Sequence, residues 1–176
     1  MSGAVFENER DRLAALHACA IIDTPREPTF DNIVFTAAQI FRVPMAMLSL
    51  IDEARVWVKA GVGPLPPSWD RDQIVSRLIT SSGDLLIIED ASAEARFSRP
   101  NTILAEAHIR FCASAPLHGP GRHVIGALSV MDRHPRTVPE RQRYQLMQLA
   151  REAEELLCLR VPDTGPLDGQ SDIGSP

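Results

Sequence analysis

The polar side chains that could line a binding site in this sequence lie inside otherwise apolar segments. They are Ser49, Arg110, Cys112, Ser114 and Ser129. A hydroxyl, thiol or guanidinium group in apolar surroundings is costly unless it is hydrogen-bonded or paired. Each of these groups therefore either bonds to a partner within the protein or faces a polar cavity that could hold a small molecule.

Arg110 needs the most explanation, because its side chain carries a charge. Its guanidinium group could reach solvent along the apolar stem, pair with an acid such as Glu106 or Asp52, or point into a polar cavity. Trp57 could form a wall of the same cavity, although an aromatic residue on a sheet more often serves ordinary packing.

The cysteines and histidines show no spacing typical of a metal site or of a nucleophile with its base. The five histidines form no H-x-H or H-E-x-x-H arrangement, and Cys19, Cys112 and Cys158 include no C-x-x-C pair. Cys112 lies within an expected strand, where a cysteine is more often a small buried hydrophobe than a reactive thiolate. Gly61 and Gly63 are not followed by a helix start at the spacing of a phosphate-binding loop. We therefore expect no metal site and no catalytic residue.

Length and charge favour a single intracellular domain. The 176 residues are 44% hydrophobic and 23% charged, as in ordinary globular proteins. A net charge of -5, without a basic cluster containing aromatic residues, argues against nucleic acid or an anionic membrane as a partner. Residues 1–12 contain no apolar signal core, and no segment approaches the length of a membrane span. With three scattered cysteines, these features predict a cytoplasmic protein with reduced thiols.

Two hairpins dominate the expected sheet. Residues 109–117 alternate between apolar and polar side chains, as in a half-buried strand, whereas residues 124–132 are apolar at both parities, as in a strand covered on both faces. The connector 118–123 is rich in turn-forming residues. Residues 45–51 and 56–62 form the second hairpin. Since hairpins join most strands, we predict an α+β fold with a largely antiparallel sheet.

Helical spacing of apolar residues predicts helices at both ends of the domain. The first two cover about 7–20 and 30–41, and a weaker pattern covers 71–82. Thr137 and Glu140 have the spacing of a capping box, in which each side chain bonds to the other residue's amide at a helix start. Residues 161–176 are rich in Pro, Gly, Asp and Ser, and we expect them to form a disordered tail.

The terminal helices carry apolar stripes that could contact a second copy. In the last helix the stripe has heptad-like intervals and is wide enough to touch both the sheet and a partner. We predict a homodimer through the terminal helices, with the interface residues Leu13, Leu16, Leu146, Leu149, Ala153 and Leu156.

The order and spacing of several motifs resemble bacterial GAF sensor domains. The motifs are Leu13 to Leu16 with Ile22 to Asp31, Pro44 to Asp52 with Arg55 to Ala60, Asp90 to Phe97, His108 to Leu117, and Ile125 to Arg133. The resemblance covers residues 7–160. It implies a central antiparallel sheet of five or six strands, with the terminal helices on one face and, on the other, a small-molecule pocket with short helices and loops.

The ligand does not follow from the resemblance, and we leave the cofactor unknown. Residues 72–79 stand where relatives commonly carry a phenylalanine-cysteine motif at the start of a pocket helix, and they contain no cysteine. This absence counts against a bilin chromophore attached at that position. The N-K-F-D-E motif of cyclic-nucleotide-binding GAF domains is also absent.

We therefore expect a non-catalytic sensory or regulatory domain of bacterial signal transduction. It would bind an unidentified small molecule, a partner protein or both, and pass strain through its terminal helices to a separate output protein. The expected pocket residues are Ser49, Trp57, Arg110, Phe111, Cys112, Ser114 and Ser129.

Two alternatives remain open at this point. One is an enzyme like the free methionine-R-sulfoxide reductases, which use pocket thiols on a GAF fold; here only Cys112 could line the pocket. The other is a ligand-free dimerisation module, in which large side chains fill the cavity. Candidates for filling it are Met45, Met47, Trp57 and Phe111.

Overall fold

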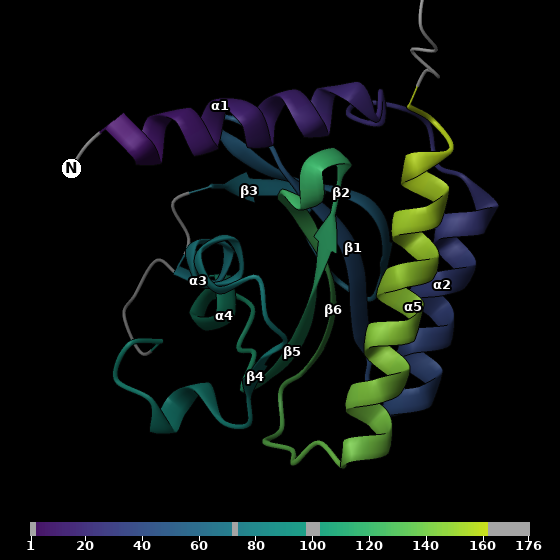
Figure 1. Ribbon diagram of the computed structural model, residues 1–176. Coiled ribbons are helices and arrows are strands. Elements are labelled where there is room, and N and C mark those ends of the chain that lie inside the picture. Colours follow the sequence, from purple (N-terminus) through teal and green to yellow (C-terminus); the bar gives the residue numbers. More distant parts are fainter. Residues whose placement is uncertain (1–2, 72–73, 98–102, 162–176) are drawn as a thin grey trace, which may run out of the picture.

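The computed structural model describes residues 3–71, 74–97 and 103–161, which form one sheet covered on both faces (Figure 1). In these residues six antiparallel strands lie in the order β3-β2-β1-β6-β5-β4. The strands are β1 (Met45–Ile51), β2 (Arg55–Val62), β3 (Ser68–Asp70), β4 (Leu86–Ile88), β5 (Phe111–His118) and β6 (Val124–Asp132). The α+β class and the antiparallel sheet predicted from the sequence are confirmed.

The three middle strands are buried on both faces. Every residue of β1 and β6 is buried, and in β5 only His118 is partly exposed. The apolar runs of β1 and β6 at both parities are explained by helices or loops packing over each side of the sheet. The alternating segment of β5 was expected to be half-buried, but the strand is covered on both faces, and its buried Cys112 and Ser114 have hydrogen-bond partners. The two edge strands, β3 and β4, have only three residues each, which limits the unpaired backbone that they present.

Two long helices cover one face of the sheet, and a third crosses its end (Figure 1). The covering helices are α2 (Pro28–Phe41) and α5 (Glu140–Cys158), and α1 (Gly3–Ala18) lies across one end. The carbonyl groups at the end of α2, which have no partner within the helix, accept hydrogen bonds from the segment before α5 and from its first turn. The Arg136 guanidinium donates to the oxygens of Phe41 and Arg42, and the Gln142 amide donates to Ile40.

The other face of the sheet is covered by short elements. These are α3 (Ile74–Ser82), the 3₁₀ turn η1 (Ala91–Ala93) and α4 (Ile103–Glu106). Phe97, Leu104 and Ile109 from this layer pack against the methionines Met45 and Met131 of the sheet. A second 3₁₀ turn, η2 (Pro120–Arg122), joins β5 to β6.

The buried side chain of Lys59 connects the sheet to the segments that precede α2 and follow α5. The Lys59 side chain on β2 is fully buried, and its ammonium group donates to Glu27 Oε1 at 2.7 Å and to Thr24 Oγ1 at 2.8 Å. The Glu27 carboxylate also accepts two hydrogen bonds of 2.9 Å from Arg160, just beyond α5. Arg160 donates further to the backbone oxygen of Cys19. The end of α5 is therefore fastened to the connection between α1 and α2.

Two local features differ from the sequence prediction. The helix α5 begins at Glu140, with Pro139 at its N-cap and no side-chain cap, so the predicted capping box does not form. The cause is Pro139, since a residue that precedes proline avoids the helical region and Val138 cannot continue a helix started at Thr137. The strand β3 was not predicted because three residues are too few to show a periodicity. Of the expected tail, residues 162–176 lie outside the described residues.

Several carboxyl groups, among them Asp132, Glu27 and Glu9, make the stability of the fold depend on pH. Burial alone raises the pKa of Asp132, but hydrogen bonds from Arg136 and His134 outweigh it, and the pKa lies below its ordinary value. The Lys59 hydrogen bond lowers the pKa of Glu27 despite partial burial, and that of Glu9 is also lowered. A lowered pKa contributes stability above the pKa of the unfolded state, about 4, which is lost as the pH falls through the folded-state pKa.

We therefore expect the free energy of unfolding to be nearly constant between about pH 6 and 8 and to fall below about pH 4.5. Urea titrations at a series of pH values measure this dependence. Asp132→Asn should make the dependence shallower, because one of these groups no longer titrates. Stability that rises on acidification would contradict the prediction.

Candidate functional site

A line of buried polar groups runs across the sheet on the face opposite α2 and α5. Ser114 on β5 and Ser129 on β6 are direct cross-strand partners, and their hydroxyl oxygens lie 2.7 Å apart. The Cys112 sulfur, two residues before Ser114 on the same strand, lies 3.3 Å from the Ser114 hydroxyl. Ser49 on β1 is also buried. All four residues point to the same side because alternate residues of a strand share a face.

Ser49, Cys112 and Ser129 border a small interior cavity between the sheet and α3, while Ser114, an expected pocket residue, lies beside it and does not line it. The cavity is lined by Met47, Ser49, Ile51, Val56, Trp69, Val75, Ile79, Leu104, Cys112, Ala127, Ser129 and Met131. Its volume is about 20 Å³, which is room for about one water molecule. Sites for small organic ligands usually measure several hundred Å³. The cavity is thus closed by its own side chains in this structure.

Arg110 does not reach this cavity. It immediately precedes β5 at the rim of the sheet, where its guanidinium donates to both carboxylate oxygens of Asp90, at 3.0 and 2.6 Å. The hydrogen bonds from Arg110 and Ser92 hold the pKa of Asp90 well below its ordinary value. The expected pocket position of Arg110 is corrected to a surface ion pair, whose described partner is Asp90 rather than Asp52, while the Glu106 side chain lies outside the described residues.

Phe111 and Trp57 lie on the opposite face, among the residues that pack under α2 and α5. Phe111 is fully buried in that core, and Trp57 packs against it with its ring 6.0 Å from the Lys59 ammonium. Phe111 adjoins Cys112 in the strand, so the two side chains must point to opposite faces. The alternation of residues 109–117 therefore indicates that Phe111 and Cys112 cannot both line the cavity.

Several cavity residues were missed by the sequence analysis of the site. Met131 and Ala127 are two residues away from Ser129, so the period of the strands could have identified them. Met47, which was expected as a side chain that fills the cavity, does line it. Trp69 belongs to β3, which was not predicted, and Leu104 comes from the short helix α4. Their arrival at the cavity depends on tertiary packing and has no local sequence signal.

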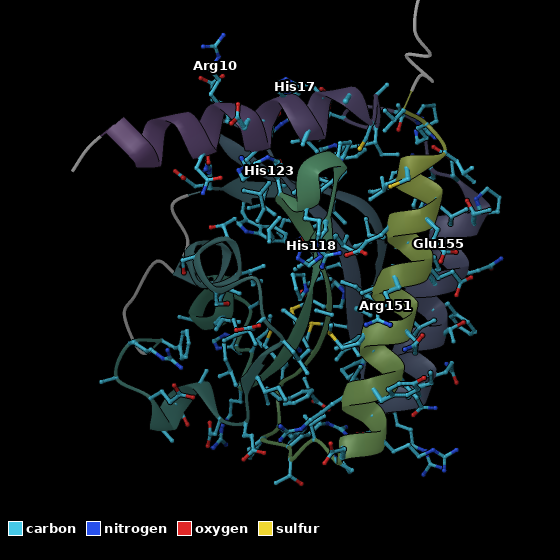
Figure 2. The ribbon with its side chains drawn as sticks, viewed as in Figure 1. Arg10, His17, His118, His123, Arg151 and Glu155 are labelled. Atoms are coloured by element: carbon cyan, nitrogen blue, oxygen red, sulfur yellow. The ribbon has the colours of Figure 1, made fainter. Side chains whose placement is uncertain are left out.

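Two further hollows lie outside the interior cavity. One groove of about 520 Å³ runs between α5 and the end of β5, where His118 Nδ1 lies 2.7 Å from Glu154 Oε1 and where Arg151 and Glu155 of α5 also lie (Figure 2). The other is a cleft of about 590 Å³ between α1, α3 and η2. Within the described ranges, no cluster of His, Cys, Asp and Glu could hold a metal ion, and no helix could cross a membrane.

Comparison with known proteins identifies the fold family. The family model described as GAF domain matches residues 25–157. This chain belongs to the GAF family. The GAF domain is 30% identical over 147 residues to a cyclic di-GMP phosphodiesterase of Pseudomonas aeruginosa strain PAO1. The match covers 82% of this chain but only 25% of that relative, so the chain spans about a quarter of the relative's length.

Solved structures of low sequence identity share the fold. The GAF domain of an Acinetobacter phosphoenolpyruvate-protein phosphotransferase is 20% identical, with a TM-score of 0.63 over 96% of this chain and 100% of that one. A free methionine-R-sulfoxide reductase from Neisseria meningitidis is 17% identical, with a TM-score of 0.60 over 86% and 90%. The PixJ GAF domain of Thermosynechococcus elongatus is 14% identical, with a TM-score of 0.59 over 85% and 86%.

The only cysteine at the cavity of this GAF domain, among the described residues, is unsuited to thiol chemistry. Burial raises the pKa of the Cys112 thiol to about 11, with a smaller opposite effect from the Ser114 hydrogen bond. Cys19 is buried in the core on the helical side, where burial and the nearby Cys158 raise its pKa to about 11. Cys158 is exposed on α5. A thiolate is the reactive form of cysteine, and burial suppresses it at Cys112.

We expect a thiol reagent such as Ellman's reagent to label Cys158 rapidly in the native protein. Cys112 and Cys19 should react at least about 100-fold more slowly, because they are buried and ionise poorly. Peptide mapping identifies the labelled residue, and denaturant should release all three thiols. Rapid labelling of Cys112 in the folded protein would contradict this assignment.

The Ser114 and Ser129 hydroxyls should be coupled energetically. Ser114→Ala leaves the buried Ser129 hydroxyl without its partner and is expected to cost about 1 to 2 kcal/mol. The double variant Ser114→Ala/Ser129→Ala should cost less than the sum of the two single changes, since it leaves no unpaired hydroxyl. Urea unfolding of the four proteins measures the coupling, and strict additivity would contradict it.

Most of the residues expected at a dimer interface are buried or partly buried within the GAF domain itself. Leu16, Leu146 and Ala153 are fully buried in the core, and Leu149 and Leu156 pack partly against it. The heptad-like stripe of α5 is therefore the face that covers the sheet. The large apolar side chains exposed on the described surface are instead Phe35, Tyr144 and Leu159, with 56%, 65% and 82% of their surface exposed.

Proposed function

We propose that this GAF domain is a non-catalytic regulatory module that binds a small molecule in its interior cavity. The observation that carries the proposal is the row of buried Cys112, Ser114 and Ser129 beside that cavity. Ligand sites typically combine a mainly apolar lining with a few fixed polar groups. Here hydroxyls supply the polar groups, and methionine and branched aliphatic side chains supply the apolar wall.

Because the cavity is closed, a ligand could enter it only if side chains of its wall move. Met47 and Met131 occupy part of its wall, and methionine side chains repack easily because they are unbranched and have three rotatable bonds. Binding would move these side chains and the α3 layer above them. We propose that this displacement is the signal, transmitted through the sheet to α5 and onward to an output domain or protein in the cytoplasm.

Thermal unfolding with a panel of small metabolites tests the proposal. A ligand present at about 100 times its Kd stabilises by about 2.7 kcal/mol, which raises the Tm by roughly 5 to 10 °C for a domain of this size. In the matched variant Ala127→Val, two added methyl groups fill the cavity wall, and the stabilisation should disappear. If no compound raises the Tm and native mass spectrometry finds no copurifying molecule, a closed module without a ligand is favoured.

The reductase alternative has weaker support from this site. It needs an accessible thiol of low pKa and a resolving partner, whereas Cys112 is buried with a raised pKa. Reductase assays of the wild type and Cys112→Ser decide the question. Reductase activity in the wild type that Cys112→Ser abolishes would overturn the non-catalytic assignment.

We also propose that two copies associate through the outer face of α2 and α5. The exposed side chains Phe35 on α2 and Tyr144 on α5 support a partner on this side, since large exposed apolar groups are characteristic of interfaces. Light scattering at tens of micromolar should give twice the mass of one chain. Tyr144→Glu should shift the mass to that of a monomer, whereas Arg151→Glu, on the groove side of α5, should not. A monomeric wild type would contradict the dimer.

A further inference from the structure

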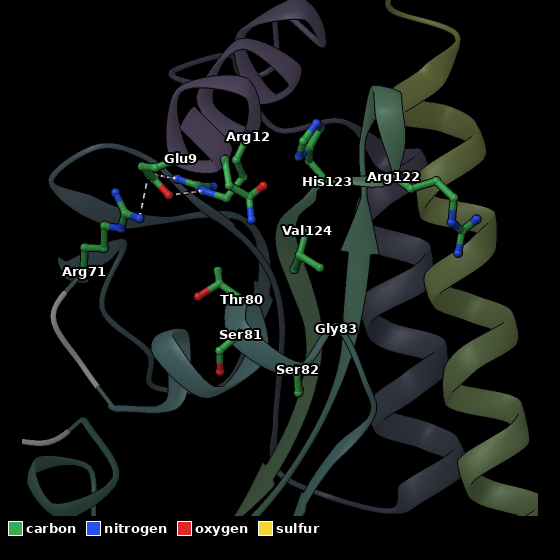
Figure 3. A pocket seen from close by; sticks show the side chains of 11 residues that line it. Glu9, Arg12, Arg71, Thr80, Ser81, Ser82, Gly83, Arg122, His123 and Val124 are labelled. Carbon is green, nitrogen blue, oxygen red and sulfur yellow. Dashed lines mark hydrogen bonds and ion pairs between the residues drawn. The ribbon is translucent and has the colours of Figure 1, made fainter. Parts of the chain in front are cut away.

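The cleft between α1, α3 and η2 is separate from the interior cavity and much larger (Figure 3). Its volume of about 590 Å³ lies in the range of small-molecule sites. One wall carries Glu9, Arg12 and Arg71, and another carries the hydroxyl groups of the last turn of α3. Two cationic side chains thus face a hollow on a protein whose net charge is -5.

The two guanidinium groups are held in place by backbone oxygens. Arg12 is almost fully buried, and its Nη1 donates to the carbonyl oxygen of Ile51, at the end of β1, at 2.6 Å. Arg71 Nη1 donates to the carbonyl oxygen of Glu53, in the β1–β2 turn, at 3.1 Å. Each guanidinium group therefore has a backbone anchor at the end of β1 or in the turn that follows it, in addition to its contact with Glu9. Such preorganisation lowers the entropic cost of binding an anion.

An internal carboxylate already lies between these two cations. Glu9 Oε1 is 2.9 Å from Arg12 Nη2 and 2.7 Å from Arg71 Nη2, and Glu9 Oε2 accepts from Arg12 Nε at 2.9 Å. Burial raises the pKa of Glu9, but the hydrogen bonds and charges of the two arginines outweigh it, so the carboxyl group stays ionised. The Glu9 carboxylate and the two guanidinium groups together carry a net positive charge.

The rest of the cleft combines polar side chains with the apolar surface of Val124. Thr80, Ser81 and Ser82 contribute hydroxyl groups from α3, and His123 lies at the opposite side (Figure 3). The Arg122 side chain extends toward α5, away from Glu9, so we do not count its charge. Guanidinium groups recognise planar carboxylates and phosphates through paired hydrogen bonds. The shared chemistry of a suitable ligand is therefore an oxyanion on a small polar molecule.

We propose that this cleft binds a small metabolite through a phosphate or carboxylate group, which displaces the Glu9 carboxylate from Arg12 and Arg71. Glu9 then acts as an internal competitor that sets the affinity. The site is formed by α1, by Arg71 just after β3 and by the end of α3, outside the interior cavity, so it gives the domain a second input.

Calorimetric titrations of the full chain with inorganic phosphate and, separately, with succinate test the proposal at constant ionic strength. Glu9→Gln removes the competing charge but keeps a side chain of the same shape, and it should tighten binding at least about tenfold. Arg71→Gln should weaken binding at least about tenfold, and Arg71→Lys should fall between it and the wild type. Arg96→Gln, at an exposed ion pair with Glu94, is the matched control and should leave affinity unchanged.

The results of these titrations distinguish binding in the cleft from binding in the interior cavity. Binding of phosphate alone, or of succinate alone, identifies the ligand class. Ala127→Val should not change either affinity, because Ala127 lines the interior cavity and is not one of the residues that line the cleft. Affinity that is the same in the wild type, Glu9→Gln and Arg71→Lys overturns the proposal, as does binding weaker than about 10 mM in Glu9→Gln for both anions. If Arg71→Gln fails to fold, the comparison of Glu9→Gln with Arg71→Lys decides.

Discussion

Replacing Gly126 with alanine is expected to destabilise this GAF domain by about 3 kcal/mol, at the upper end for adding atoms to a packed core. Gly126 on β6 pairs with Leu50 on β1, at the centre of the sheet. A Cβ atom at this position would lie 2.2 Å from the Ser49 carbonyl oxygen and 2.9 Å from Leu50 Cδ2. The nearest atom belongs to the backbone of a buried strand, so a side-chain rotation cannot relieve the clash.

Urea unfolding measures this loss, and Gly61→Ala provides the matched control. Gly61 also lies in a strand paired with β1, but a Cβ atom there would meet its nearest neighbour, Val58 Cγ1, at 3.4 Å, an ordinary contact. The control should change the free energy of unfolding by less than about 1 kcal/mol. Equal effects of the two substitutions would show that the close approach at Gly126 is not the cause.

Neutralising Glu27 is expected to cost more than removing its partner Lys59. Glu27→Gln leaves the ammonium group of a fully buried lysine without an anion, whereas Lys59→Met replaces it with an apolar chain of similar length. We expect about 2 to 3 kcal/mol for Glu27→Gln, below the value for a completely buried pair because the Glu27 side chain is 33% exposed. Lys59→Met should cost about 1 kcal/mol, since Glu27 keeps Arg160.

The double variant distinguishes this account from simple loss of contacts. With Lys59→Met in place, the further change Glu27→Gln should cost less than it does in the wild type, because no buried cation is left unpaired. Denaturant unfolding of the four proteins gives the coupling energy. If Lys59→Met proved the more damaging single change, the contacts of the ammonium group with Thr24, Pro25 and the Phe30 and Trp57 rings, which methionine cannot make, would be the dominant contribution.

Most of the fold could be predicted from the sequence, because burial leaves a local pattern. The predicted strand at residues 45–51 has the bounds of β1, and the helix predicted at 30–41 differs from α2 by two residues at its start. A strand covered on both faces shows a continuous apolar run, and a helix with one apolar face shows apolar residues three or four positions apart. The short strand β3 has neither pattern, and it was missed.

The candidate site could be predicted only in part, because a pattern identifies faces but not volumes. A polar residue inside an apolar run was informative at Ser49, Cys112 and Ser129, which the structure brings to one cavity. Phe111 was assigned to that cavity for its size, against the alternation of its own strand. How far Met47 and Met131 fill the space depends on side-chain packing across three strands, which no local pattern specifies.

The filled cavity sets a concentration threshold for any molecule that must enter it. When the competent, open form is a minor population, the apparent affinity falls in proportion to the fraction of molecules that are open. An open fraction of about 1% would weaken the apparent Kd about 100-fold relative to the intrinsic value. The domain would then stay unoccupied at low concentrations of its ligand. The two methionine side chains, rather than the polar contacts, would determine the ligand concentration at which it responds.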